Sequence, residues 1–276
     1  MQGGSRVRRW LILALLWGVA LLFLIPFLWM LSSSLKPNYQ IFEVPPRWIP
    51  NPPRWENYVE ALTILPFPLY IRNTAIITLL TIAGHLLSCT VIAYAFARLR
   101  APGRDFLFVV MLATMMLPYP VTMVPLYVLF NRLGWINTFL PLVVPAYLGI
   151  PFYIFLMRQF FLTIPRDFED AARVDGANEW EVFLKVVVPL SWPGFLTVGL
   201  VVALSVWNEF LLATVFLTDQ ERFTVVTSYY NFTARFSRDW GLTSAAAVMM
   251  IAPILVIFLA LQRRFIDGLT QGGLKA

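Results

Sequence analysis

The chain has 276 residues, of which 59% are hydrophobic and only 13% are charged. A soluble domain of this length carries about twice that charged share, so the composition favours a membrane protein. The net charge of +6 does not indicate nucleic-acid binding, because the basic residues lie in short loops and tails without interleaved aromatic residues.

The chain has one cysteine, Cys89, and one histidine, His85, and both lie in apolar stretches. A single cysteine excludes a disulfide within the chain, and neither residue has the companions that a zinc or haem site needs. We therefore expect no cofactor and no metal in this chain. For His85, a role in helix packing is favoured over a role as ligand or proton carrier.

Six apolar runs are long enough, at about 20 residues each, to cross the hydrocarbon core of a bilayer. No segment alternates in hydrophobicity like the strands of a barrel, so the predicted fold is an all-α membrane protein forming one domain, residues 1–276. The predicted helices are residues 11–31, 73–97, 106–130, 139–157, 195–217 and 242–262. The first run follows three arginines and is too long for a cleaved signal peptide, which predicts a retained signal anchor.

The distribution of Lys and Arg predicts the orientation of the spans. The tails and loops on one side, residues 1–10, 98–105, 158–194 and 263–276, hold 13 basic residues in 69 positions. The loops on the other side, residues 32–72, 131–138 and 218–241, hold 8 basic residues in 73 positions. Both termini are therefore predicted to be cytoplasmic, in a bacterial-type inner membrane, and residues 32–72 to be external.

The external loop 32–72 is rich in proline but also carries Trp48, Trp55 and Tyr58. A flexible tether does not need these aromatic residues, so the loop is predicted to dock a partner or to pack on its own helices. Prolines also punctuate the third and fourth spans, where they predict kinks beside a cavity or within a packed bundle.

The internal loop 158–194 is long, acidic and helical in pattern. Pro165 suits a first helical position, and acidic residues follow where the helix dipole favours anions: Asp167, Glu169 and Asp170. Gly176 is placed to end this helix in a left-handed turn.

A second helix is predicted to start directly after the glycine. Asn178 and Glu181 have the spacing of a capping box. The apolar face is predicted to be Trp180, Phe183, Leu184 and Val187, with Pro189 interrupting the helix. An interfacial helix lying on the bilayer is the alternative, but six acids against four bases in this loop disfavour it.

The string Asp170-Ala171-Ala172, then Gly176, then Val186-Val187-Val188-Pro189 resembles the EAA motif of ATP-binding-cassette importer permeases. The departures are conservative, with Asp for Glu and Val for Ile and Leu. The surrounding string from Glu169 to Ala177 is similar to the carbohydrate branch, and to its smaller maltose-type permease subunit. So are Trp207-Asn208-Glu209-Phe210 and the tail from Arg264 to Gly273.

This resemblance implies a type I importer permease, whose loop 158–194 is a coupling helix seated in an ATPase. It implies a second homologous permease subunit, an ATPase dimer that binds ATP and Mg²⁺, and an external solute-binding protein that delivers a sugar or oligosaccharide. The residues implied to couple to the ATPase are Glu169, Asp170, Ala171, Ala172, Asp175, Gly176 and Pro189. The chain itself has no GxxxxGK[ST] phosphate loop, so it is predicted to be a non-catalytic subunit.

Glu209 is the one carboxylate predicted inside a membrane span, where a charge costs about 2.5–3.5 kcal/mol on insertion scales. Together with Asn208 it is a candidate for the substrate path, and an interhelical hydrogen bond or gate is the alternative. Two other functions stay open: an ion-coupled secondary transporter, for which one carboxylate is a thin relay, and a membrane scaffold without transport.

Overall fold

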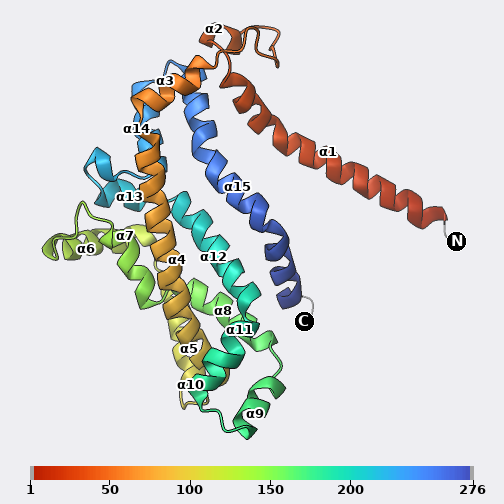
Figure 1. Ribbon diagram of the computed structural model, residues 1–276, viewed down its shortest axis with the longest axis vertical. Coiled ribbons are helices and arrows are strands. Elements are labelled where there is room, and N and C mark those ends of the chain that lie inside the picture. The colour runs from red at the N-terminus through yellow and green to blue at the C-terminus, as the bar shows by residue number, and fades with distance from the viewer. Residues whose placement is uncertain (1–2, 274–276) are drawn as a thin grey trace. The chain divides into compact units, whose positions relative to one another are not determined.

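The computed structural model describes residues 3–273, and every regular element in that range is a helix, which confirms the predicted all-α fold (Figure 1). Three helices are long and apolar enough to cross a membrane. They are α1 (Gly3–Ser33), α4 (Phe67–Arg98) and α15 (Trp240–Gly273). Up to six spans result if each of three bent helix pairs crosses once.

Two of the three bent pairs lie in the third and fourth spans, where the prolines predicted kinks. The first consists of α5 (Arg104–Ala113), the 3₁₀ turn η1 (Thr114–Met116) and α6 (Tyr119–Arg132), and bends by 92°. Pro118 lies at that break as the N-cap of α6. Proline lacks an N–H and keeps the preceding residue out of the helical region, so the helix breaks there.

The second pair consists of α7 (Leu140–Val143), the 3₁₀ helix η2 (Val144–Leu148) and α8 (Pro151–Thr163), and bends by 41°. Gly149 has φ +86° at this break, a conformation that a side chain would strain. The predicted helix 195–217 is likewise broken: α12 (Trp192–Trp207) ends before residues 208–210, and α13 (Leu211–Phe216) follows. The short helices η4 (Gln220–Arg222) and α14 (Val225–Arg235) complete this part of the chain.

The chain divides into two compact units. The first comprises residues 1–67 and 229–252 and includes α1, α2 (Asn38–Ile41) and α3 (Glu56–Ile64). In it, Lys36 is fully buried, lies 4.3 Å from the ring centroid of Trp29 and donates to the Arg47 carbonyl. Trp48 packs edge-on against Trp29 at 5.2 Å. The loop after α1 is therefore packed on its own helix rather than extended, although Trp55 remains exposed.

The second unit comprises residues 68–228 and 253–276. Its buried core joins α4, α8 and α12 to the segment 182–187. The core residues include Cys89, Ala93, Tyr94, Met157, Phe161, Val182, Phe183, Val187, Val198 and Val202. The internal loop is thus continuous with the core of the helices that precede and follow it.

We predict that Gly241→Ala destabilises the first unit. A Cβ at Gly241 would overlap the Lys36 carbonyl oxygen and lie 2.9 Å from Nδ2 of Asn57, which itself donates to that carbonyl. Overpacking of this kind costs about 1–3 kcal/mol. Thermal unfolding of the purified protein in detergent measures the loss. Gly18→Ala is the control, because a Cβ at Gly18 meets nothing within 4 Å; equal melting temperatures for the two variants would contradict the prediction.

Candidate functional site

The internal loop folds as two helical pieces joined by a glycine turn. The first, α9 (Asp167–Val174), carries three acids in its first turn and Arg173 in its last, as the helix dipole favours. Gly176 follows with φ +90°, so the predicted left-handed stop is confirmed. The helix starts later than predicted, because Arg166 is its N-cap and Pro165 lies outside it.

The second piece begins with the predicted capping box. The Glu181 N–H donates to Oδ1 of Asn178 at 3.0 Å, and the Asn178 N–H donates to Oε2 of Glu181 at 3.1 Å. This box starts α10 (Glu179–Glu181), which continues into the π-helix η3 (Val182–Val187) and α11 (Val188–Leu190). The Glu181 carboxylate accepts hydrogen bonds from Lys185 and from the Asn178 N–H, and both lower its pKa.

The π-helix changes which side chains are buried. Phe183 and Val187 are buried as predicted, but Trp180 and Leu184 are exposed and Val182 is buried instead. The prediction assumed 3.6 residues per turn, whereas the wider π-turn pairs residues five apart. Val182 and Val187 therefore share the inward side.

Pro189 was predicted to interrupt this helix, and it does not. It lies in the first turn of α11, and the helical segment 179–190 continues past it. The bend of 71° falls after Leu190, where α12 begins.

The two faces of α9 have different environments. Glu169 is buried, with 2% of its surface exposed, and Ala172 packs against the core of the second unit. Asp170 and Val174, four residues apart on the opposite side, are exposed, Val174 by 88%, and Phe168 is exposed as well. Of the seven residues implied to meet the ATPase, Asp170, Ala171, Asp175, Gly176 and Pro189 are exposed, whereas Glu169 and Ala172 face inward.

Sequence reasoning missed Phe168 and Val174. Both are apolar residues in an otherwise acidic helix, six positions apart, with Ala171 midway between them. Residues three apart are neighbours on a helix, so Phe168 and Val174 each lie next to Ala171, on its two sides. Large apolar side chains left in solvent are typical of a surface that meets a partner.

Charged groups tie α9 to its surroundings. Nε of Arg98, the last residue of α4, lies 2.7 Å from Oε1 of Glu169, and both side chains are buried. Arg173 pairs with Asp170 and Glu179 at 2.9 Å each. The bond between Arg173 and Glu179 raises the pKa of the arginine and lowers that of the carboxyl. In Figure 1, α9 and α10 lie at the end of α4 that carries Arg98.

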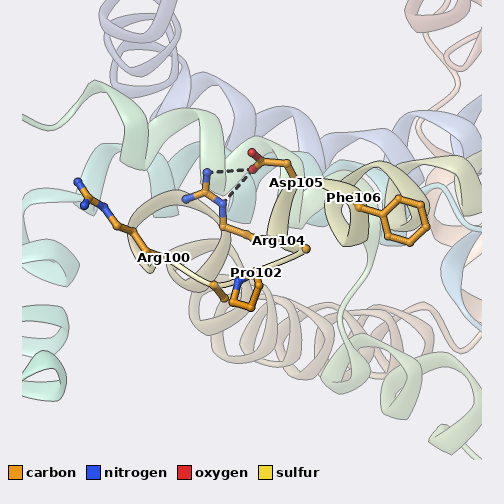
Figure 2. A pocket seen from close by; sticks show the side chains of 7 residues that line it. Arg100, Pro102, Arg104, Asp105 and Phe106 are labelled. Atoms are coloured by element: carbon orange, nitrogen blue, oxygen red, sulfur yellow. Dashed lines mark hydrogen bonds and ion pairs between the residues drawn. The ribbon is translucent and has the colours of Figure 1, made fainter.

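Arg98 is one of three basic residues in the predicted loop 98–105 that were counted for the orientation of the spans. The structure places it inside the protein, while Arg100 and Arg104 line an open pocket in the turn that follows α4. Figure 2 shows Arg104 turned toward Asp105, which it binds at 2.9 Å, and Arg100 extending away from that pair. Of the three basic residues counted in this loop, only Arg100 and Arg104 lie at the protein surface.

Glu209 lies at the break between α12 and α13. Its Oε1 accepts the N–H of Leu212 at 2.9 Å, so the carboxylate caps the restarted helix. Asn208 donates from Nδ2 to the Leu204 carbonyl at 2.8 Å and is exposed. Asn208 and Glu209 were both predicted to line the substrate path. At this break Asn208 instead bonds the end of α12, whereas Glu209 bonds the start of α13.

Glu209 also lines a cavity of about 300 Å³ within the second unit, and Asn208 does not. Most lining side chains are apolar, and His85, Thr81, Tyr119 and Ser205 are among the polar ones. Nδ1 of His85 and Oγ1 of Thr81 are buried without a hydrogen-bond partner. Within residues 3–273, no group of three or more His, Cys, Asp or Glu side chains is placed to hold a metal ion.

Residues 89–271 match the family described as the binding-protein-dependent transport system inner membrane component. The chain belongs to this family. The membership confirms the resemblance carried by the EAA-like string, and the matched range contains α9, the glycine turn and the helix that follows.

Similar proteins align with this chain over nearly its whole length. The sulfoquinovosyl glycerol transport system permease protein SmoH of Agrobacterium fabrum is 34% identical, over 91% of this chain and 89% of that protein. The trehalose transport system permease protein SugB of Mycobacterium tuberculosis is 33% identical, over 99% and 100%. A solved bacterial ABC transporter involved in the import of the acidic polysaccharide alginate superimposes with a TM-score of 0.81 at 24% identity, covering 96% of this chain and 99% of that one, and shows the same fold.

Proposed function

We propose that this permease forms one half of the path of an ATP-driven importer, and that residues 164–190 are its coupling element. The observation that carries the proposal is the two-sided build of that element. Asp170 and Val174 lie on its exposed side and Phe168 is exposed beside them, while Val182 and Val187 on its inner side continue the core of the membrane helices. A partner that moves the exposed side therefore moves the helices behind it.

The partners follow from the family. An ATPase dimer, which binds ATP and Mg²⁺, docks on the exposed side of α9, and a second homologous permease completes the path. An external solute-binding protein delivers the substrate; a solved alginate ABC transporter in complex with its substrate-bound periplasmic protein has a TM-score of 0.66 to this chain. The most apolar stretch of α1 is not buried within this chain, so its surface suits contact with lipid or with a partner helix.

The substrate class is a sugar or oligosaccharide. The names of SmoH and SugB specify carbohydrate substrates, and both proteins align along more than nine-tenths of this chain. The cavity beside Glu209 is our candidate for part of the substrate path, because hydroxyl groups match its carboxylate and the unpaired atoms of His85 and Thr81. Uptake into proteoliposomes that contain ATP but no ion gradient tests the proposal; uptake that instead requires an ion gradient would indicate a secondary transporter.

We predict that residues 158–194 and both termini are cytoplasmic and that residues 32–72 are external. A cysteine at exposed position 175, in a Cys89→Ser background, should react with a membrane-impermeant maleimide only after the cells are opened. A cysteine at exposed position 59 in α3 is the matched control and should react in intact cells. The reverse pattern would overturn the orientation.

We predict that Gly176→Val prevents coupling while leaving insertion intact. A Cβ at Gly176 meets nothing within 4 Å, so the effect comes from φ +90°, which strains a β-branched residue by about 1–3 kcal/mol. The strain should tilt α9 against α10, and ATPase co-purification or binding-protein-stimulated hydrolysis should be lost. Asp170→Lys should have a milder effect, since it places a cation near a helix N-terminus.

Gly134→Val is the control for this experiment. Gly134 also has positive φ, +69°, and open space, but it lies in the loop 131–138 predicted to be external. Its substitution should cost similar stability and leave ATPase binding unchanged. Normal docking and normal stimulated hydrolysis in Gly176→Val would remove the main support for the coupling role.

We predict that Glu209→Gln assembles normally and alters transport. The glutamine oxygen still accepts the Leu212 N–H and so keeps the cap, while the charge facing the cavity is lost. Uptake should change across substrate concentrations, with basal ATP hydrolysis largely retained. Asn208→Asp, next to it but outside the cavity, is the comparison; parent-like uptake by Glu209→Gln would exclude a charge-based role.

A further inference from the structure

We propose that Arg98 is a positioning residue which joins the coupling element to α4 and α8, so that motion of α9 is passed to both helices through one buried guanidinium. This inference rests on the proposed coupling role of residues 164–190. It adds a specific route: the docked helix moves the end of α4 through the pair of Arg98 and Glu169, in addition to apolar packing.

The guanidinium extends from the end of α4 and contacts two other helices at once. Its Nε lies 2.7 Å from Oε1 of Glu169 in the first turn of α9, as a charge contact whose N–H is not aimed at that oxygen. Its Nη2 donates to the carbonyls of Phe161 and Ile164 at 2.6 and 2.7 Å. Those carbonyls belong to the C-terminal end of α8, where backbone acceptors lack helical partners.

This arrangement requires an arginine at position 98. A planar guanidinium can reach two carbonyls with one nitrogen and a carboxylate with another, whereas a lysine ammonium is a single point charge. The cation lies at the C-terminal end of α8 and the carboxylate near the N-terminal end of α9, so both helix dipoles favour the pair. Only 3% and 2% of the two side chains are exposed, so water does not compete for either charge.

A second tie lies one turn earlier on α4. The Tyr94 hydroxyl donates to Oε2 of Glu179 at 3.1 Å, and Arg173 bridges Glu179 to α9. Glu179 and Arg173 are partly exposed, and exposed ion pairs contribute little on their own. The buried pair is therefore the strong member of a joint with two attachment points on α4.

A purely structural role would explain why Arg98 and Glu169 are buried, but not why Arg98 contacts both α8 and α9. Variants separate a structural role from a role in passing on motion. Glu169→Gln removes the negative charge while keeping a similar shape. Arg98→Lys keeps the positive charge but loses the planar guanidinium and its several N–H donors. The exchanged pair Arg98→Glu with Glu169→Arg restores opposite charges, but it turns a carboxylate toward the Phe161 and Ile164 carbonyls. The double variant Arg98→Met with Glu169→Met removes both charges together, which is often tolerated where loss of one partner is not.

The first measurement is the distance between spin labels at positions 100 and 167, both exposed, in the assembled transporter with Cys89→Ser. We expect a narrow distribution in the parent, a broad one in Glu169→Gln, in the double-Met variant and in the exchanged pair, and an intermediate one in Arg98→Lys. Lys185→Met, which breaks the exposed pair with Glu181, is the matched control and should leave the distribution narrow. Parent-like distributions in all Arg98 and Glu169 variants would overturn the proposal.

The second measurement is sugar uptake per ATP hydrolysed in proteoliposomes. ATPase co-purification should persist in the double-Met variant, because Glu169 is not on the exposed face of α9. Uptake per ATP should fall roughly two- to thirtyfold, the range that substitutions along coupling networks produce. Full recovery in the double-Met variant or in the exchanged pair would show that the joint only stabilises the fold.

The two proposals can fail separately. If the parent transporter shows no ATP-driven uptake, the proposed function is wrong, and the spin-label distances still decide whether Arg98 positions α9. If the parent transports and couples normally while the distances stay narrow in all Arg98 and Glu169 variants, the proposed function stands and the joint is overturned.

Discussion

The structure depends on one continuous apolar core that runs from the membrane helices into the internal loop. Val182, Phe183 and Val187 lie in the same core as side chains of α4, α8 and α12. A loop that packed only on itself could change orientation without affecting the spans. Protein interiors are close-packed and deform little, so a segment that shares a core with three helices transmits displacement to them.

Charged contacts add direction to this packing. Apolar side chains that slide past one another exchange one set of contacts for a similar set, whereas the Arg98 guanidinium has no equivalent second position for its carbonyl and carboxylate partners. Polar side chains also fix the positions where the helices are broken. Glu209 and Asn208 supply hydrogen bonds where α12 ends and α13 begins, so the interrupted backbone is satisfied locally, as an apolar surrounding requires.

Features set by neighbouring residues could be predicted from the sequence. The glycine stop at Gly176 and the capping box of Asn178 and Glu181 depend on local backbone conformation, and both are present. Features set by distant residues could not. No pattern in residues 179–190 indicates a π-helix, so the exposure of Leu184 was predicted wrongly, and the Arg98 partner lies 71 positions away in the sequence. The breaks in the spans fall between these cases: the prolines predict kinks but not where a helix restarts.

The two-sided build of α9 also changes how its acidic residues are understood. Glu169 and Asp170 are adjacent and chemically alike, yet the helix turns one into the core and the other into solvent. A carboxylate in solvent can be offered to a docking partner at little cost, because water and salt screen it until contact. A buried carboxylate needs a permanent counter-charge, which Arg98 provides. The neighbouring acids of the EAA-like string therefore divide into one that faces outward, where the ATPase is proposed to dock, and one that holds α9 to the end of α4.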